Sequence, residues 1–297
     1  MFRIQSTIEN HKSYVILENA AKTTSAKIAV EEGGRLSELK VNNVFIIKEI
    51  EDFAYANSYA SSVLFPFANR IKEGKYTFLG EDYQFEKNEN NSNALHGLVF
   101  DKTFELFEPE EHQDNCSATF NYYEKERHAA FPYQYFISLT YTLFEDKLQL
   151  RVTVKNMDDK PFPFTLGWHP YFYSDKLSDC VLNFKSDKKV QFDEALITDK
   201  IVENPDKENF KIEDKKLDDC YFLADNLVAF STPKYNLKIT SNALKNFLQL
   251  YTPNGFPLIA IEPMTGVSDS FNNKIGLQVL EPKETHVISW NLGVTIK

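Results

Sequence analysis

Apolar and polar residues alternate along much of this chain with a period of two, the pattern of a β-strand that buries one face. The clearest run covers residues 137–143, where Ile, Leu and Tyr alternate with Ser and Thr. A polar turn, Glu145-Asp146-Lys147, follows it, and a second alternating run covers residues 148–154. Because two such runs on either side of a short polar turn are typical of a β-hairpin, we predict a hairpin here.

Shorter runs of the same kind recur along the chain, most of them bounded by polar residues, Gly, Pro or Asn. They cover residues 14–17, 26–30, 227–231, 237–240, 247–252, 258–261 and 285–290. No long helical periodicity and no Ser/Gly- or Pro-rich linker interrupts them, and the most charged stretch, residues 199–219, is expected to be a solvated loop between strands. We therefore predict an all-β fold, a large antiparallel sandwich with few short helices, in which residues 1–297 form a single domain.

The composition adds to this prediction and narrows the possible partners. With 25 Phe and 15 Tyr against 10 Gly, the chain is rich in residues that favour pleated surfaces and offer flat apolar faces to ligands. A formal net charge of −10 and the lack of a basic run argue against a nucleic-acid partner. Cys116, Cys180 and Cys220 are far apart and odd in number, so we expect reduced thiols and neither a disulfide framework nor a zinc site.

The N-terminal residues lack the basic-then-apolar pattern of a signal peptide, and no apolar stretch approaches the about 20 residues that span a bilayer. We therefore expect a cytoplasmic protein without a membrane partner. The edge strands of a sheet can pair with a second copy of the chain or remain unpaired, so the sequence is compatible with both a monomer and a homodimer.

Two of the six histidines lie in apolar or aromatic surroundings with few charges. His96 lies in residues 93–97, where the following glycine permits close approach of the backbone, and His169 lies in the aromatic residues 166–172. Either histidine could line an aromatic pocket, and either could instead be a hydrogen-bonded structural residue. Of the others, His286 is ambiguous, and surface positions are expected for His11, His112 and His128.

A polar pair, Asn69-Arg70, is flanked by apolar residues. A buried arginine must be paired or must present its donors to the oxygens of a ligand, so an internal salt bridge and a ligand contact are both open. Asp218 adjoins an aromatic run and Glu284 precedes the last alternating run, but spacing alone does not distinguish either from surface charge among 43 acidic residues.

Read in order, these motifs resemble the aldose 1-epimerase (galactose mutarotase) family from about residue 30 onward. They are Asn69-Arg70, Asn93-Ala94-Leu95-His96-Gly97, Gly167-Trp168-His169-Pro170-Tyr171-Phe172, Asp218-Asp219-Cys220-Tyr221 and Pro282-Lys283-Glu284-Thr285. Residues 74–78 are also similar to a strand that follows the Asn-Arg pair in that family. The resemblance implies a β-supersandwich with an open sugar cleft, and an isomerase that interconverts the α and β anomers of a free aldose without a metal or cofactor.

Opening a pyranose ring requires a base that removes the anomeric hydroxyl proton and an acid that protonates the ring oxygen. By the resemblance, Glu284 is the base at O1 and His169 the acid at O5, with His96 beside the ring oxygen. Glu281 and Glu262 compete with Glu284 for the role of base. The substrate-contacting residues that the resemblance implies are Asn69, Arg70, Asp218 with Asp219 as the alternative, Trp168 and Tyr171.

Departures from the family pattern bear on the substrate. Lys283 replaces a glycine of the family, Met264 replaces a sugar-binding glutamine common in galactose mutarotases, and the residues after His169 also differ. Galactose is therefore not predicted as the sugar. A hexose-6-phosphate mutarotase, with Lys72 and Lys75 near the phosphate, and a non-catalytic carbohydrate-binding module remain alternatives, although the acidic net charge favours a neutral aldose.

Overall fold

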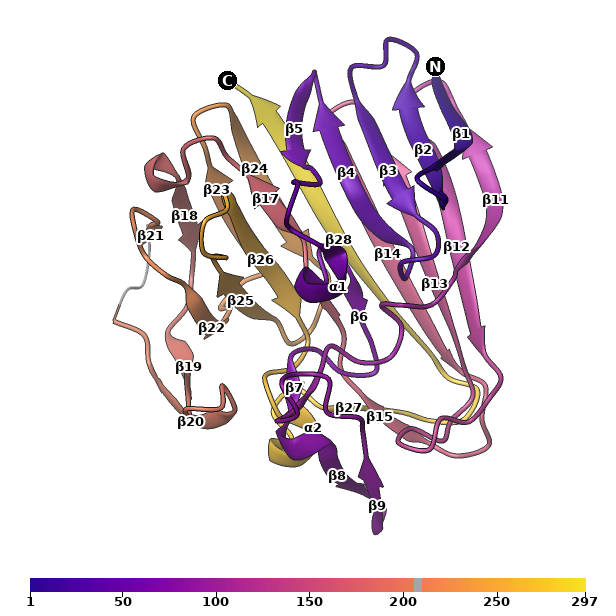
Figure 1. The fold of residues 1–297 in the computed structure, drawn as a ribbon, viewed down its shortest axis with the longest axis vertical. Helices are drawn as coiled ribbons and strands as arrows, with labels where there is room; N and C mark the ends of the chain where they lie inside the picture. The colour runs from indigo at the N-terminus through magenta and orange to yellow at the C-terminus, as the bar shows by residue number, and fades with distance from the viewer. Residues whose placement is uncertain (206–209) are drawn as a thin grey trace.

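The computed structural model describes residues 1–205 and 210–297, and within these ranges most of the regular structure is antiparallel β-sheet (Figure 1). The predicted all-β fold is confirmed. The described helices are single turns, namely α1 (Tyr55–Ser58), α2 (Ser270–Asn273) and the 3-10 turns η1 (Lys72–Gly74) and η2 (Leu177–Asp179). None of these described helices has the length or the apolar character that crossing a bilayer would require.

A large sheet runs through the whole molecule, and nine of the described strands form it. In sheet order these are β11 (Glu105–Glu111), β12 (Cys116–Glu124), β13 (Tyr135–Leu143), β14 (Lys147–Asn156), β28 (Thr285–Ile296), β24 (Tyr235–Ser241), β23 (Leu227–Ser231), β18 (Val181–Phe184) and β21 (Phe210–Lys211). The predicted hairpin is confirmed as β13 and β14, with Leu143 opposite Leu148. β28 lies between β14 and β24 and so joins the two halves of the sheet.

A second sheet covers one half of this large sheet. Its strands, in order, are β1 (Phe2–Glu9), β2 (Lys12–Asn19), β3 (Ser25–Ala29), β4 (Arg35–Val41) and β5 (Val44–Ile47). Figure 1 shows them in front of β11–β14, and the Tyr141 hydroxyl of β13 donates to the Gly34 carbonyl just before β4 at 2.9 Å.

A third sheet carries most of the strands that matter for the site. In order it contains β20 (Thr198–Glu203), β19 (Lys188–Phe192), β22 (Asp218–Phe222), β25 (Phe247–Tyr251), β26 (Leu258–Met264), β16 (Gly167–Trp168) and β6 (Val63–Leu64), with β17 (Tyr171–Tyr173) also paired to β26. Three strand pairs complete the described structure: β7 (Arg70–Ile71) with β10 (Ala94–Leu95), β8 (Lys75–Phe78) with β9 (Glu81–Gln84), and β15 (Phe162–Phe164) with β27 (Gln278–Leu280).

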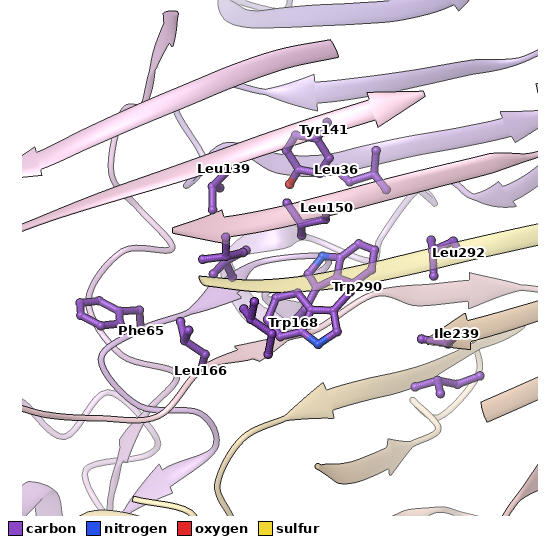
Figure 2. Close-up of a cluster of buried hydrophobic side chains, with 14 of the residues drawn as sticks. Leu36, Phe65, Leu139, Tyr141, Leu150, Leu166, Trp168, Ile239, Trp290 and Leu292 are labelled. Atoms are coloured by element: carbon purple, nitrogen blue, oxygen red, sulfur yellow. The ribbon is translucent and has the colours of Figure 1, made fainter. Parts of the chain in front are cut away.

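The core lies between the large sheet and the other two. Figure 2 shows Trp168 of β16 beside Trp290 of β28, and their stacked rings are 6.1 Å apart between centroids. Both indoles are fully buried, and Nε1 of Trp168 donates to the Ser61 carbonyl at 3.2 Å. Trp168 is therefore a core residue, in contrast to the sugar contact that the resemblance implied.

The charged stretch at residues 199–219 is not simply a loop, and that prediction is wrong for most of the part that the structure describes. It contains most of β20, all of β21 and the start of β22, while residues 206–209 lie outside the described residues. Strands β20 and β21 lie at sheet edges, where both faces can carry polar residues, so their charge does not distinguish them from a loop. Cys116, Cys180 and Cys220 are buried free thiols.

Candidate functional site

A cavity of about 300 Å³ opens where α1, the β7–β10 pair and the third sheet meet. Segments far apart in the sequence contribute to its lining. The lining residues are Asn57, Ser58, Tyr59, Asn69, Arg70, Glu89, Leu95, His96, His169, Tyr171, Leu196, Asp218, Gln249, Tyr251 and Glu262. The structure thus brings together the predicted residues Asn69, Arg70, His96, His169, Tyr171 and Asp218.

The short β7–β10 pair places the Asn-Arg motif beside His96. Arg70 lies opposite Leu95, and the backbone N–H of His96 donates to the Asn69 carbonyl at 2.9 Å. Asn69 and His96 both have left-handed backbones, with φ of +60° and +64°. Such conformations are uncommon for residues other than glycine and concentrate at functional sites.

Gly97 allows this arrangement. Its φ is +79°, and a Cβ atom there would lie 2.2 Å from the Phe65 carbonyl oxygen. Only glycine can therefore follow His96 without displacing the neighbouring backbone.

His169 and Glu262 form a buried pair in the lining of the cavity. His169 follows β16, Glu262 lies on β26, and these two strands are paired directly. Nε2 of His169 lies 3.4 Å from Oε1 of Glu262, and the two side chains are 6% and 3% exposed. Burial raises the pKa of Glu262 well above its usual value and lowers the pKa of His169 to about 4. Burial thus favours the uncharged forms of both groups, a carboxylic acid beside a neutral imidazole.

His96 is the second imidazole at this point. Its ring centroid lies 5.0 Å from that of His169, with the rings nearly perpendicular. Burial, and then the neighbouring His169, lower the pKa of His96 well below its usual value. Nδ1 of each histidine is buried and has no hydrogen-bond partner among the described residues. Buried polar atoms without a partner are costly and uncommon in native structures.

Amide and carboxylate groups form the polar side of the cavity. Nδ2 of Asn69 donates to Oε1 of Gln249 at 3.4 Å, and Nε2 of Gln249 donates to Asp218 at 2.7 Å. Burial raises the pKa of Asp218. Asp218 lines the cavity and Asp219 does not, which agrees with the choice of Asp218.

Arg70 is held by a carboxylate that the sequence motifs did not reveal. Its Nε and Nη2 donate to Glu89 at 2.6 to 3.0 Å, and Nη1 donates to Asn69 at 3.2 Å. The salt-bridge interpretation of this arginine is therefore confirmed, and because Arg70 also lines the cavity, the ligand contact stays a prediction.

The structure does not place Glu284 at the site, so its assignment as the base is corrected. Glu284 is exposed in the turn before β28, where its carboxylate accepts the Glu281 N–H at 3.1 Å and its carbonyl accepts the Asn156 N–H at 3.0 Å. Lys283 has a left-handed φ of +68°, so the turn keeps its shape without the family's glycine. Glu262, the competing choice, occupies the position beside His169.

The sequence motifs did not predict several residues that line the cavity, notably Glu89, Gln249, Tyr59 and Tyr251, because no motif contains them. Gln249 and Glu262 carried one usable signal, since each is a polar residue within an otherwise apolar strand. His286 is half-buried against Phe164, away from the cavity. Among residues 1–205 and 210–297 no group of three or more His, Cys, Asp or Glu side chains is placed to hold a metal ion.

A model of the aldose 1-epimerase family matches residues 14–292. The chain belongs to the aldose 1-epimerase family. Similar proteins include YihR of Escherichia coli K12, described as uncharacterized, which is 24% identical over 89% of this chain and 88% of its own length. Galactose mutarotase of Sus scrofa is 28% identical over 59% of this chain and 50% of that protein.

Solved structures share the fold of this aldose 1-epimerase family member. A galactose mutarotase-like protein from Clostridium acetobutylicum superimposes with a TM-score of 0.86 at 20% identity, covering 100% of this chain and 99% of that one. Galactose 1-epimerase from Lactobacillus acidophilus gives a TM-score of 0.83 at 17% identity, with the same coverage. The family that the motifs indicated is therefore confirmed.

Proposed function

We propose that this chain is a mutarotase that interconverts the α and β anomers of a neutral free aldose. The observation that carries the proposal is the buried pair of His169 and Glu262, 3.4 Å apart in a cavity that also holds His96 and Arg70. Ring opening needs an acid and a base at adjacent oxygens, and a carboxyl group beside an imidazole can supply both.

In the proposed reaction the pair uses one proton. Its transfer from Glu262 to His169 gives a carboxylate beside an imidazolium, the form that reacts with the sugar. The Glu262 carboxylate removes the proton from the O1 hydroxyl while the bond from C1 to O5 breaks, and His169 protonates O5. The open-chain aldehyde then rotates about the bond from C1 to C2, and the reverse proton transfers close the ring as the other anomer.

The remaining groups are suited to holding a neutral sugar. Arg70 can donate to hydroxyl oxygens and Asp218 can accept from hydroxyl groups, while His96 lies beside His169. Tyr171 stacks on His169 with centroids 4.9 Å apart and so fixes the plane of the imidazole. These contacts orient the sugar ring against the acid–base pair.

Two observations favour a neutral substrate over a hexose phosphate. Lys72 and Lys75 are exposed and do not line the cavity, and Lys75 pairs with Glu73 at 2.7 Å. The cavity itself carries the acidic residues Glu89, Asp218 and Glu262. A phosphate dianion needs an excess of cationic donors, which this lining lacks among the described residues.

The experiment that tests the proposal is measurement of α-to-β conversion of glucose, galactose, xylose, arabinose and glucose 6-phosphate by polarimetry or NMR. A conversion rate of a neutral sugar above its spontaneous rate supports the proposed mutarotase activity. Acceleration of glucose 6-phosphate alone would favour a sugar-phosphate mutarotase, and binding without acceleration would favour a non-catalytic carbohydrate-binding protein.

A further inference from the structure

We propose that Glu89 determines substrate specificity at this site: its carboxylate fixes the Arg70 guanidinium for sugar hydroxyls and keeps anionic sugars out of the cavity. The inference rests on the proposed function, and it assigns a role to a residue outside the motifs that identify the family. Glu89 is a positioning residue for Arg70 and acts on an anionic sugar through its charge.

The contact between the two side chains is bidentate. Nε of Arg70 donates to both carboxylate oxygens of Glu89, at 3.0 and 2.8 Å, and Nη2 donates to Oε1 at 2.6 Å. Nη1 donates to Asn69 at 3.2 Å. An arginine has five N–H donors, and one on each of the three nitrogens is used here, which leaves two, one on Nη1 and one on Nη2, for the oxygens of a sugar.

Glu89 is itself held in place by the chain around it. Its backbone N–H donates to the Asn93 carbonyl at 3.2 Å, and its carbonyl accepts the Ser92 N–H at 2.8 Å. The buried Asn93 side chain donates to Oε2 of Glu89 at 3.4 Å and accepts the Glu73 N–H at 3.1 Å. The carboxylate is therefore fixed by a turn that is anchored on both sides, unlike a mobile ion pair at the surface.

The ion pair of Arg70 and Glu89 is largely buried, so it determines the charge that Arg70 presents to the cavity. The Arg70 and Glu89 side chains are only 12% and 21% exposed, and both line the cavity. Without Glu89, the largely buried guanidinium would lose its ion-pair partner and could attract an anion. With Glu89 present, that charge is already neutralised.

The charged side chains that line the cavity carry more negative than positive charge. Among the described lining residues, Arg70 is the one Lys or Arg side chain, and Glu89 and Asp218 are carboxylates beside it. A sugar that carries its own carboxylate or phosphate therefore meets an excess of negative charge, and this repulsion separates it from a neutral sugar of the same shape.

The test compares two sugars that share a pyranose ring and a free anomeric carbon, glucose and glucuronate. For the wild-type enzyme, kcat/KM for mutarotation of glucose should exceed that of glucuronate by about tenfold or more. Glu89→Gln should raise KM for glucose with little change in kcat, and should raise the ratio of glucuronate to glucose kcat/KM by about tenfold. Thermal melting establishes that each variant is folded.

Two further variants separate charge from position. Glu89→Asp keeps the charge but shortens the side chain, so it should raise KM for glucose without admitting glucuronate. Glu73→Gln removes an equivalent charge from an exposed residue that does not line the cavity. It should leave kcat/KM unchanged for both glucose and glucuronate.

The outcomes distinguish this inference from the proposed function. Wild-type enzyme that accelerates no sugar would overturn both. Wild-type enzyme that accelerates glucose and glucuronate equally, or a folded Glu89→Gln variant with the wild-type ratio, would overturn the role of Glu89 and leave the mutarotase intact.

Discussion

Replacing Glu262 with glutamine is the sharpest test of the acid–base pair. The amide has nearly the same shape as the acid, so the cavity is retained, but it can neither accept the O1 proton nor pass one to His169. General acid–base catalysis contributes about 100- to 10,000-fold to a rate, so Glu262→Gln should lower kcat by that factor, a loss of about 3 to 5 kcal/mol of transition-state stabilisation. Polarimetry with the neutral sugar that the wild-type enzyme converts fastest measures this loss of kcat.

The matched control is Glu284→Gln, which removes a carboxylate from an exposed turn outside the cavity. Its kcat should stay within about twofold of the wild type, as for most surface substitutions. If the control loses activity while Glu262→Gln retains it, the assignment of Glu262 as the base is refuted and the motif glutamate regains that role.

Stability provides an independent readout of the same carboxyl group. The pKa of Glu262 is raised by burial, so the folded protein holds this proton at pH values where the unfolded chain has released it. The contribution of Glu262 to stability is therefore lost as pH rises above about 4.5 toward the pKa in the folded state. The Tm of Glu262→Gln relative to that of the wild type should increase with pH, which calorimetry between pH 5 and pH 8, a range of about 3 pH units, can follow.

Three further predictions test other parts of the structure. Because the pKa of His169 is lowered to about 4, the acid limb of the kcat/KM profile should lie near pH 4, and a limb near the ordinary histidine value of about 6.5 would contradict the buried pair. Trp168→Phe should lower the free energy of unfolding, measured by denaturant titration, by about 2 kcal/mol and leave KM for the sugar unchanged. A raised KM would instead indicate that Trp168 contacts the sugar. Gly97→Ala should cost at least about 2 kcal/mol in the same titration, because its Cβ would meet the Phe65 carbonyl at 2.2 Å, and wild-type stability would show that the backbone adjusts freely.

Local patterns in the sequence predict the strands well because alternation reports directly on burial. In β13 and β14 every second side chain faces the core, and the hairpin and its turn follow from that pattern. β20 and β21 lacked such a pattern because edge strands can be polar on both faces. Their position depends on neighbours in the sheet that no local window contains.

The site shows the same division between local and long-range information. The motifs around His96 and His169 mark side chains that do meet in the cavity. The partner of His169 could not be read from the sequence, because it depends on the pairing of β16 with β26, whose residues are far apart along the chain. The motif glutamate, Glu284, was preferred for its local pattern and lies elsewhere.

Alternation along a strand could have resolved two of the uncertain assignments. Trp168 and His169 are neighbours in an extended segment, and such neighbours point to opposite faces of a sheet. If His169 lines the cavity, Trp168 must therefore face the core, where it packs on Trp290. The same reasoning allows only one of Asp218 and Asp219 to face the cavity.

The place of β28 in the large sheet has a consequence for biosynthesis. This strand lies between β14 and β24, so neither half of the sheet has its inner neighbour until Thr285–Ile296 has left the ribosome. Until then β14 and β24 each expose an unpaired edge with apolar residues on one face, a condition that favours aggregation.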